Sequence, residues 1–138
     1  MESHNSNNPN KIPNQSQENV WDIVASDWNK WKKTSDPKVS EFVKNAKGNL
    51  LDLGCGSGRN FSETKAKIYG IDFSKEMIKY AKEKAKNLNI SSELIVGNAN
   101  KLPYENNFFN NEISIAFLHC IEGEDNRKKT IEELYRVL

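Results

Sequence analysis

The chain has 138 residues, of which 36% are apolar and 28% charged, and this composition predicts a single domain with a modest core. Its net charge of +1 excludes a general polybasic character, so contact with nucleic acid would need a local patch or a partner. The two cysteines are too few for a disulfide framework or a zinc site, and no segment approaches the roughly 20 apolar residues that cross a bilayer. We therefore expect reduced thiols, no metal and a cytoplasmic location.

The first 18 residues are almost all polar, and they bury too little apolar surface to offset the entropy of ordering. We predict a disordered tail over residues 1–18 and one domain over residues 19–138. From residue 20 onward, helical spacing predicts a helix over 20–31 that covers the ligand site, with core packing as the alternative. The residues expected on its inward face are Val20, Trp21, Val24, Trp28 and Trp31.

A second helix is predicted over residues 38–47, opened by a proline at position 37. The residues expected to face inward are Val39, Phe42 and Val43. This helix leads into the first predicted strand, which ends at Leu53.

Residues 51–58 read LDLGCGSG, a short apolar strand followed by a glycine-rich turn. Gly54, Gly56 and Gly58 let the backbone turn sharply and approach a ligand closely, because glycine has no side chain to obstruct it. A dinucleotide fingerprint would have its third glycine where this chain has Arg59, so that pattern fits poorly. The turn therefore indicates a nucleoside cofactor of another kind.

A second strand is predicted over residues 68–72, and it ends in Asp72 about twenty residues after the first strand. A carboxylate at this place can accept the hydroxyl hydrogens of a ribose. The alternative is an N-cap for the next helix, although Ser74 already supplies a good cap. The short connection between the strands leaves room for a helix of little more than residues 59–64.

A third helix is predicted over residues 75–87, with Met77 also a candidate to pack on an adenine. The residues expected to face the sheet are Met77, Ile78, Ala81 and Ala85. Lysines on the other side favour a solvated face, with nucleic-acid contact as the alternative. These lysines are Lys75, Lys79, Lys82 and Lys86.

Two further strands are predicted, over residues 93–96 and 113–118, followed by a helix from about Asn126. Strands that alternate with helices indicate an α/β fold with a parallel sheet and right-handed connections. Ligands collect at the carboxyl ends of such strands, where Asn98 and His119 follow the third and fourth strands.

Several segments together carry a resemblance to a known family: LDLGCGSGRN, YGIDFSKEM, NANKLPYENNFF, EISIAFLHCIE and the leading ASDWNKWKK. Over about residues 19–138 the chain resembles the tRNA wobble-uridine (5-carboxymethyluridine) methyltransferases and the methyltransferase domain of AlkB-type tRNA hydroxylases. Both are class I S-adenosylmethionine-dependent methyltransferases. The resemblance implies the Rossmann-like class I fold with helices on both faces of the sheet, C-terminally truncated so that the first four strands are present and the last three absent.

The resemblance implies S-adenosyl-L-methionine as the cofactor, with the glycine loop around its methionyl end. Asn98 stands where the family commonly has an aspartate that reaches the adenine amino group. The cofactor-binding residues expected on this basis are Asp52, Gly54, Cys55, Gly56, Gly58, Asp72, Phe73, Met77, Asn98 and Ala99.

The implied reaction is methyl transfer to the carboxylate of 5-carboxymethyluridine in tRNA. A carboxylic acid is already ionised at neutral pH, so the nucleophile needs positioning more than a base. His119 is expected either to contact the wobble nucleotide or to cap the strand end, and Lys32 to meet a phosphate or the carboxylate. A small zinc-binding activator subunit is the expected partner along the third strand, where Leu94, Ile95 and Val96 offer an apolar edge.

Two alternatives remain open at this point. One is a methyltransferase of the same fold that acts on a small metabolite such as a quinone precursor. The other is a non-catalytic remnant that keeps the cofactor-binding half of the fold.

Overall fold

The computed structural model describes residues 16–138, and most of the predicted disordered tail lies outside these residues. The first described element is helix α1, Gln17–Trp31, which begins two residues before the predicted domain boundary. Ser16 caps it, because its hydroxyl accepts a hydrogen bond from the backbone N–H of Asn19 at 3.4 Å.

A parallel sheet forms the centre of the fold, as the sequence predicted, and its strand order is β3-β2-β1-β4. Its strands are β1, Asn49–Leu53; β2, Lys67–Asp72; β3, Ser92–Val96; and β4, Asn111–Ile113. In the register, Leu53 pairs with Ile71, and Asp72 pairs with Val96. The carboxyl ends of the strands therefore lie side by side at the same end of the sheet, where the residues that follow the strands come together.

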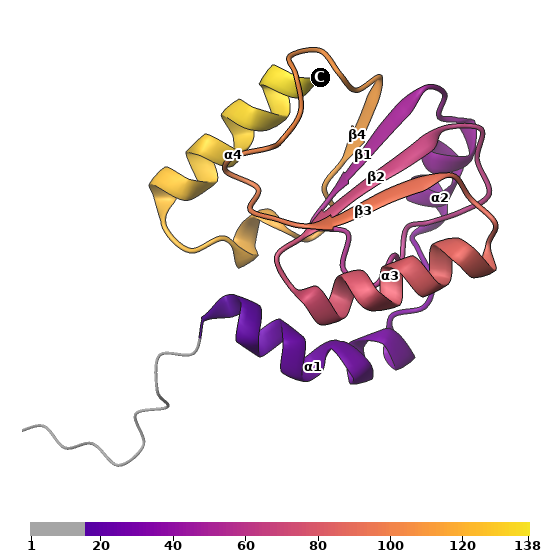
Figure 1. Ribbon diagram of the computed structural model, residues 1–138, viewed down its shortest axis with the longest axis horizontal. Coiled ribbons are helices and arrows are strands. Elements are labelled where there is room, and N and C mark those ends of the chain that lie inside the picture. The colour runs from indigo at the N-terminus through magenta and orange to yellow at the C-terminus, as the bar shows by residue number, and fades with distance from the viewer. Residues whose placement is uncertain (1–15) are drawn as a thin grey trace, which may run out of the picture.

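Helices cover both faces of the sheet, with α4 on one side and α2 on the other (Figure 1). The helices after α1 are α2, Pro37–Asn45; α3, Lys75–Asn87; the short 3-10 helix η1, Leu118–Cys120; and α4, Glu124–Val137. Helix α1 runs along the outside of α3, away from the sheet (Figure 1). Within residues 16–138, every helix is too short or too polar to cross a lipid bilayer.

Alternate residues of the strands enter two separate apolar clusters, one on each face of the sheet. Leu50 of β1 packs in the cluster that contains Val43 of α2 and Ile78 of α3. Its neighbour Leu51 packs in the opposite cluster, which contains Val137 of α4. All four residues expected on the inward face of α3 are buried. Ile78, Ala81 and Ala85 belong to the first cluster, whereas Met77 is buried outside both clusters.

Helices α1 and α2 bury narrower faces than the apolar spacing predicted. In α1 the fully buried residue is Ala25, Trp21 and Trp28 are half-buried, and Trp31 is 83% exposed. The reason is that α1 packs against a single helix, which covers only one narrow stripe. In α2, Phe42 is 45% exposed, because the helix contacts the core through the buried Val43 and the partly buried Val39.

Two predicted elements differ from the structure. Residues 59–64 form no helix: the chain turns at 59–60 and continues without regular structure, because Gly58 has φ +81° and its carbonyl oxygen accepts a bond from the N–H of Phe61 at 3.0 Å. The fourth strand comprises three residues and ends at Ile113, whereas the prediction ran over 113–118. Beyond it the chain leaves the sheet, with Ala116 at φ +54°, and this places the ring of Phe117 against Gly54.

Candidate functional site

The glycine loop that follows β1 curls over the end of β2. The N–H groups of Gly54 and Cys55 both donate to the carbonyl oxygen of Ile71, at 2.8 and 3.1 Å. Gly54, Gly56 and Gly58 have φ values of +71°, +54° and +81°, a region that glycine occupies without strain. The predicted sharp turn is confirmed.

The three glycines are required for different reasons. A Cβ on Gly54 would lie 2.2 Å from the ring of Phe117, and one on Gly58 would lie 2.7 Å from the ring of Phe61. For a Cβ on Gly56, the nearest atom would be the sulfur of Met77, at 4.0 Å. Two of the glycines thus permit close packing, while Gly56 faces open space.

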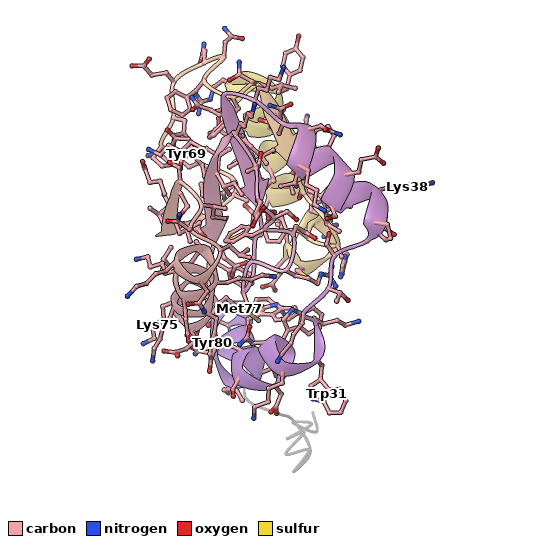
Figure 2. The ribbon with its side chains drawn as sticks, turned by 90° about the vertical axis from the view of Figure 1, so that its right-hand side faces the viewer. Trp31, Lys38, Tyr69, Lys75, Met77 and Tyr80 are labelled. Atoms are coloured by element: carbon pink, nitrogen blue, oxygen red, sulfur yellow. The ribbon has the colours of Figure 1, made fainter. Side chains whose placement is uncertain are left out.

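That open space is a cavity, called the loop pocket here, between the glycine loop, α1 and the segment after β4. Five residues of the predicted cofactor set line it besides Gly56 itself: Gly54, Cys55, Asp72, Phe73 and Met77. Its outer wall includes Trp21 and Trp28, whose rings meet edge to face at 5.1 Å. Met77 lies on the side of α3 that faces α1, whereas Trp31 extends away from the sheet (Figure 2).

A second cavity of about 230 Å³, called the amide pocket here, adjoins the loop pocket. It contains Asn98 and Ala99 of the predicted set together with the side-chain amides of Asn100 and Asn126. The two pockets share Phe73, Phe117 and Cys120. A ligand with an aromatic base and a polar tail would therefore find aromatic walls at the junction and amide groups at one end.

Asp72 holds the glycine loop in place. Its carboxylate accepts bonds from the N–H of Gly56 at 3.0 Å and from the N–H of Ser74 at 2.9 Å. Burial raises the pKa of Asp72, and these two backbone bonds oppose the shift. Each carboxylate oxygen has a second lone pair, so a further bond from a ligand hydroxyl remains possible. The N-cap of α3 is Ser74, whose hydroxyl accepts from the N–H of Met77 at 3.1 Å.

Asp22 connects α1 to the start of α3. Its Oδ1 accepts a hydrogen bond from the Ser74 hydroxyl and another from the N–H of Glu76 at 3.2 Å. A carboxylate at a helix N-terminus also interacts favourably with the helix dipole. The sequence did not reveal this role of Asp22, because aspartates are common on the solvent-facing side of an amphipathic helix. Through this contact, α1 is fixed with its two inner tryptophans over the loop pocket.

Asp52, which the sequence predicted to bind the cofactor, lies behind the glycine loop and lines neither pocket. The side chain belongs to a central strand and is 1% exposed, so it is enclosed by the sheet and the loop. Among residues 16–138, neither of its carboxylate oxygens has a hydrogen-bond partner. Burial, and then the negative charge of Asp72, raise the pKa of Asp52 to about 7, while Arg59 opposes the shift.

His119 and Lys32, the two residues expected to contact the substrate, lie outside both pockets. His119 is exposed on η1, and its neighbour Cys120 lines the pockets instead. The 3-10 turn after the shortened β4 causes this reversal, because it rotates the side chains relative to an extended strand. Lys32 is exposed at the end of α1, with its ammonium 5.7 Å from the centre of the Trp28 ring.

The two cysteines are the thiols of the site, and burial affects the pKa of both. Burial, with the negative charges of Asp52 and Asp72, raises the pKa of the Cys55 thiol, which favours its neutral form. Burial also raises the pKa of Cys120. In the part of the chain that the structure describes, no three His, Cys, Asp or Glu side chains gather as a metal site requires.

Comparison with known proteins adds family information to this geometry. A family model for a methyltransferase domain matches residues 51–138. Over 122 residues the chain is 34% identical to the tRNA (carboxymethyluridine(34)-5-O)-methyltransferase of Arabidopsis thaliana, covering 86% of this chain and 29% of that protein. Over 95 residues it is 38% identical to the demethylmenaquinone methyltransferase of Oceanobacillus iheyensis, covering 64% and 39%. The chain thus spans less than half the length of either relative.

The fold also has solved counterparts. A chain in the complex between the Haloferax volcanii Trm112 methyltransferase activator and a methyltransferase candidate superposes with a TM-score of 0.68. The identity is 21%, and the match covers 86% of this chain and 55% of that one. At this identity the similarity shows the shared fold.

Proposed function

Because the chain belongs to the class I S-adenosylmethionine-dependent methyltransferases, we propose that it contributes to methyl transfer onto the carboxylate of 5-carboxymethyluridine in tRNA. The observation that carries this proposal is the 122-residue similarity to the Arabidopsis enzyme, which extends over 86% of this chain. The similarity to the quinone methyltransferase covers a smaller share, 64%.

The residues at the carboxyl ends of the strands fit the proposed cofactor. Gly56 brings backbone to the wall of the loop pocket without a side chain, and Asp72 there can accept bonds from ribose hydroxyls. Phe73 provides an aromatic surface for adenine at the junction of the pockets, and Asn98 an amide oxygen in the amide pocket. A contact of Asp52 with the methionyl end stays a prediction, since its enclosed side chain lines neither pocket.

When bound, S-adenosylmethionine supplies an electrophilic methyl group on a positively charged sulfur. The protein then has to position an already ionised carboxylate and exclude water, both of which lower the barrier without a general base. Trp21, Trp28 and Phe117 provide apolar walls around the loop pocket for this purpose. Contacts of His119 and Lys32 with the substrate stay predictions, since neither side chain lines these pockets.

We further propose that a small activator subunit pairs along β3. This strand is an edge of the sheet within residues 16–138, and Val96 is 53% exposed on it. An exposed edge strand can accept another strand through its free backbone groups. The shared fold with the Haloferax chain supports testing this partner. Coexpression with a Trm112-type protein should increase the yield of folded chain, whereas a Val96→Lys variant should gain less.

The substrate is tested by incubating the chain, alone and with the activator, with S-adenosylmethionine labelled in its methyl group. The acceptors are tRNA that carries 5-carboxymethyluridine, the same tRNA with unmodified uridine, and demethylmenaquinone. Alkali-labile label in the first tRNA alone would support the proposed ester. Label in demethylmenaquinone would favour a quinone methyltransferase, the alternative suggested by the 38% identity to the Oceanobacillus enzyme. Cofactor binding with no label in any acceptor would favour a non-catalytic chain.

A further inference from the structure

A third cavity, called the lysine pocket here, is bounded in part by Ser57 of the glycine loop and has a volume of about 300 Å³. Lys32 and Lys33 enter it from the segment after α1, and Lys84 enters it from the last turn of α3. Glu83 is the acidic side chain in its wall. Tyr80, which also lines the cavity, lies where α3 faces α1 (Figure 2). Three cations against one carboxylate make this cavity positive.

In the described part of the chain, the ammonium group of Lys84 has no negatively charged partner. It donates to the carbonyl oxygens of Arg59 at 3.3 Å and of Lys33 at 3.5 Å. Among residues 16–138, no carboxylate lies within 4.0 Å of the charged groups of Lys33, Lys84 or Arg59. Partial burial, and then the positive charge of Arg59, lower the pKa of Lys84. A partly buried cation held in this way gains more from a bound anion than a fully solvated lysine does.

The position of the lysine pocket relates it to the proposed reaction. Ser57 of the glycine loop lines both the lysine pocket and the loop pocket. An anion bound by Lys33 and Lys84 would therefore lie beside the part of the glycine loop that also borders the proposed cofactor site. Lys79 and Lys82 of α3 differ from Lys84, because both are exposed and line none of the three cavities.

We propose that the lysine pocket binds a backbone phosphate of the RNA substrate and so fixes the RNA beside the glycine loop. The inference rests on the proposed function, because it requires an RNA substrate. Phosphate fits the cavity chemically, since Lys33 and Lys84 supply compact ammonium donors and Asn29 and Asn87 add amide donors at its wall. The competing occupant is the carboxylate of the cofactor itself.

The test compares two double variants with the same change in charge. In one, Lys33→Gln is combined with Lys84→Gln; in the other, Lys79→Gln is combined with Lys82→Gln as the control. Binding of bulk tRNA is measured between 50 and 200 mM salt, S-adenosylmethionine binding by calorimetry, and folding by circular dichroism. Each phosphate that the variant no longer neutralises should reduce the salt slope by about 0.7 to 0.9. We expect the pocket variant to bind tRNA about tenfold more weakly with a shallower slope, and the control to change less than twofold.

Three results would overturn the inference. They are equal weakening by the two variants, a loss of cofactor affinity in the pocket variant with tRNA binding unchanged, and no tRNA binding by the unaltered chain. Failure of the proposed reaction has a different signature. In that case tRNA would bind through the lysine pocket, as the pocket variant would show, while 5-carboxymethyluridine would receive no methyl group.

Discussion

The carboxylate of Asp72 and the backbone N–H of Gly56 are joined by a hydrogen bond of 3.0 Å across sixteen positions of the chain. This bond ties the end of β2 to the middle of the glycine loop. The acid expected to bind ribose therefore also holds the loop that is expected to surround the methionyl end. We therefore expect cofactor affinity and loop stability to be coupled at this side chain.

Asp72→Ala should destabilise the chain even without cofactor. The substitution leaves the N–H groups of Gly56 and Ser74 without their acceptor, at a cost of about 1–3 kcal/mol. Thermal unfolding in the absence of S-adenosylmethionine measures this effect. Asp72→Asn keeps one acceptor oxygen and should fall between the two. An unchanged melting temperature in Asp72→Ala would contradict the role of Asp72 as a loop anchor.

Asp52→Asn should stabilise the chain above neutral pH. In the folded chain the pKa of Asp52 is raised from 3.8 to about 7, so the folded state retains a proton that the unfolded state has lost. The free energy of unfolding is therefore not reduced by this carboxyl below pH 4. It falls as the pH rises from about 4 to about 7, and above pH 7 the reduction stays the same. The total loss is about 4 kcal/mol if the shift is fully expressed.

This effect is measured as the difference in unfolding free energy between the variant and the unaltered chain at pH 5 and pH 8. The advantage of Asp52→Asn should be larger at pH 8. Asp27→Asn is a suitable control, because the side chain of Asp27 is 78% exposed. An advantage that is the same at both values would show that the Asp52 carboxyl does not titrate in this range.

Gly54→Ala and Gly56→Ala should separate packing from ligand access. At Gly54 the added Cβ meets the Phe117 ring at 2.2 Å, so we expect a loss of several kcal/mol or failure to fold. At Gly56 the cost should be about 1 kcal/mol, because the main penalty is the positive φ. Denaturant unfolding and calorimetric titration should show Gly56→Ala folded but weaker in cofactor binding. Equal stability of the two variants would contradict the close packing of the Phe117 ring on Gly54.

Asp22→Ala should loosen α1 from the rest of the chain. All three tryptophans of the chain, Trp21, Trp28 and Trp31, lie in α1, so tryptophan fluorescence reports on this helix. Loss of the bonds from Ser74 and Glu76 should shift the emission to longer wavelength and increase quenching by acrylamide. Asp27→Ala, on the exposed side of the same helix, should leave both unchanged. Quenching equal to that of the unaltered chain would show that apolar packing alone holds α1.

Asn98→Asp should leave cofactor affinity equal or better. Asn98 lines the amide pocket, where an amide oxygen can accept from an adenine amino group, and a carboxylate would accept the same bond with a negative charge. Calorimetric titration with S-adenosylmethionine measures the change. A marked loss of affinity would place the adenine elsewhere.

The spacing of apolar residues and glycines was enough to predict the parallel sheet, helix α3 and the turn after Leu53, because these features depend on local backbone preferences and strand burial. It failed for β4 and for residues 59–64. There the local pattern favours a strand or a short helix, but the approach of Phe117 to Gly54 and the positive φ of Gly58 decide the path.

The sequence by itself determined the class of fold, the acid at the end of β2 and the glycine loop, since each depends on residue type at a fixed position along one segment. Only the tertiary structure decided that Asp52 is enclosed, that Asp22 reaches α3 and that His119 points away while Cys120 lines the pockets. These facts depend on contacts between separate segments of the chain, which lie 52 and 54 residues apart in the case of Asp22, and on the rotation of side chains in a short turn. Residue type and spacing do not specify either of these before the chain is packed.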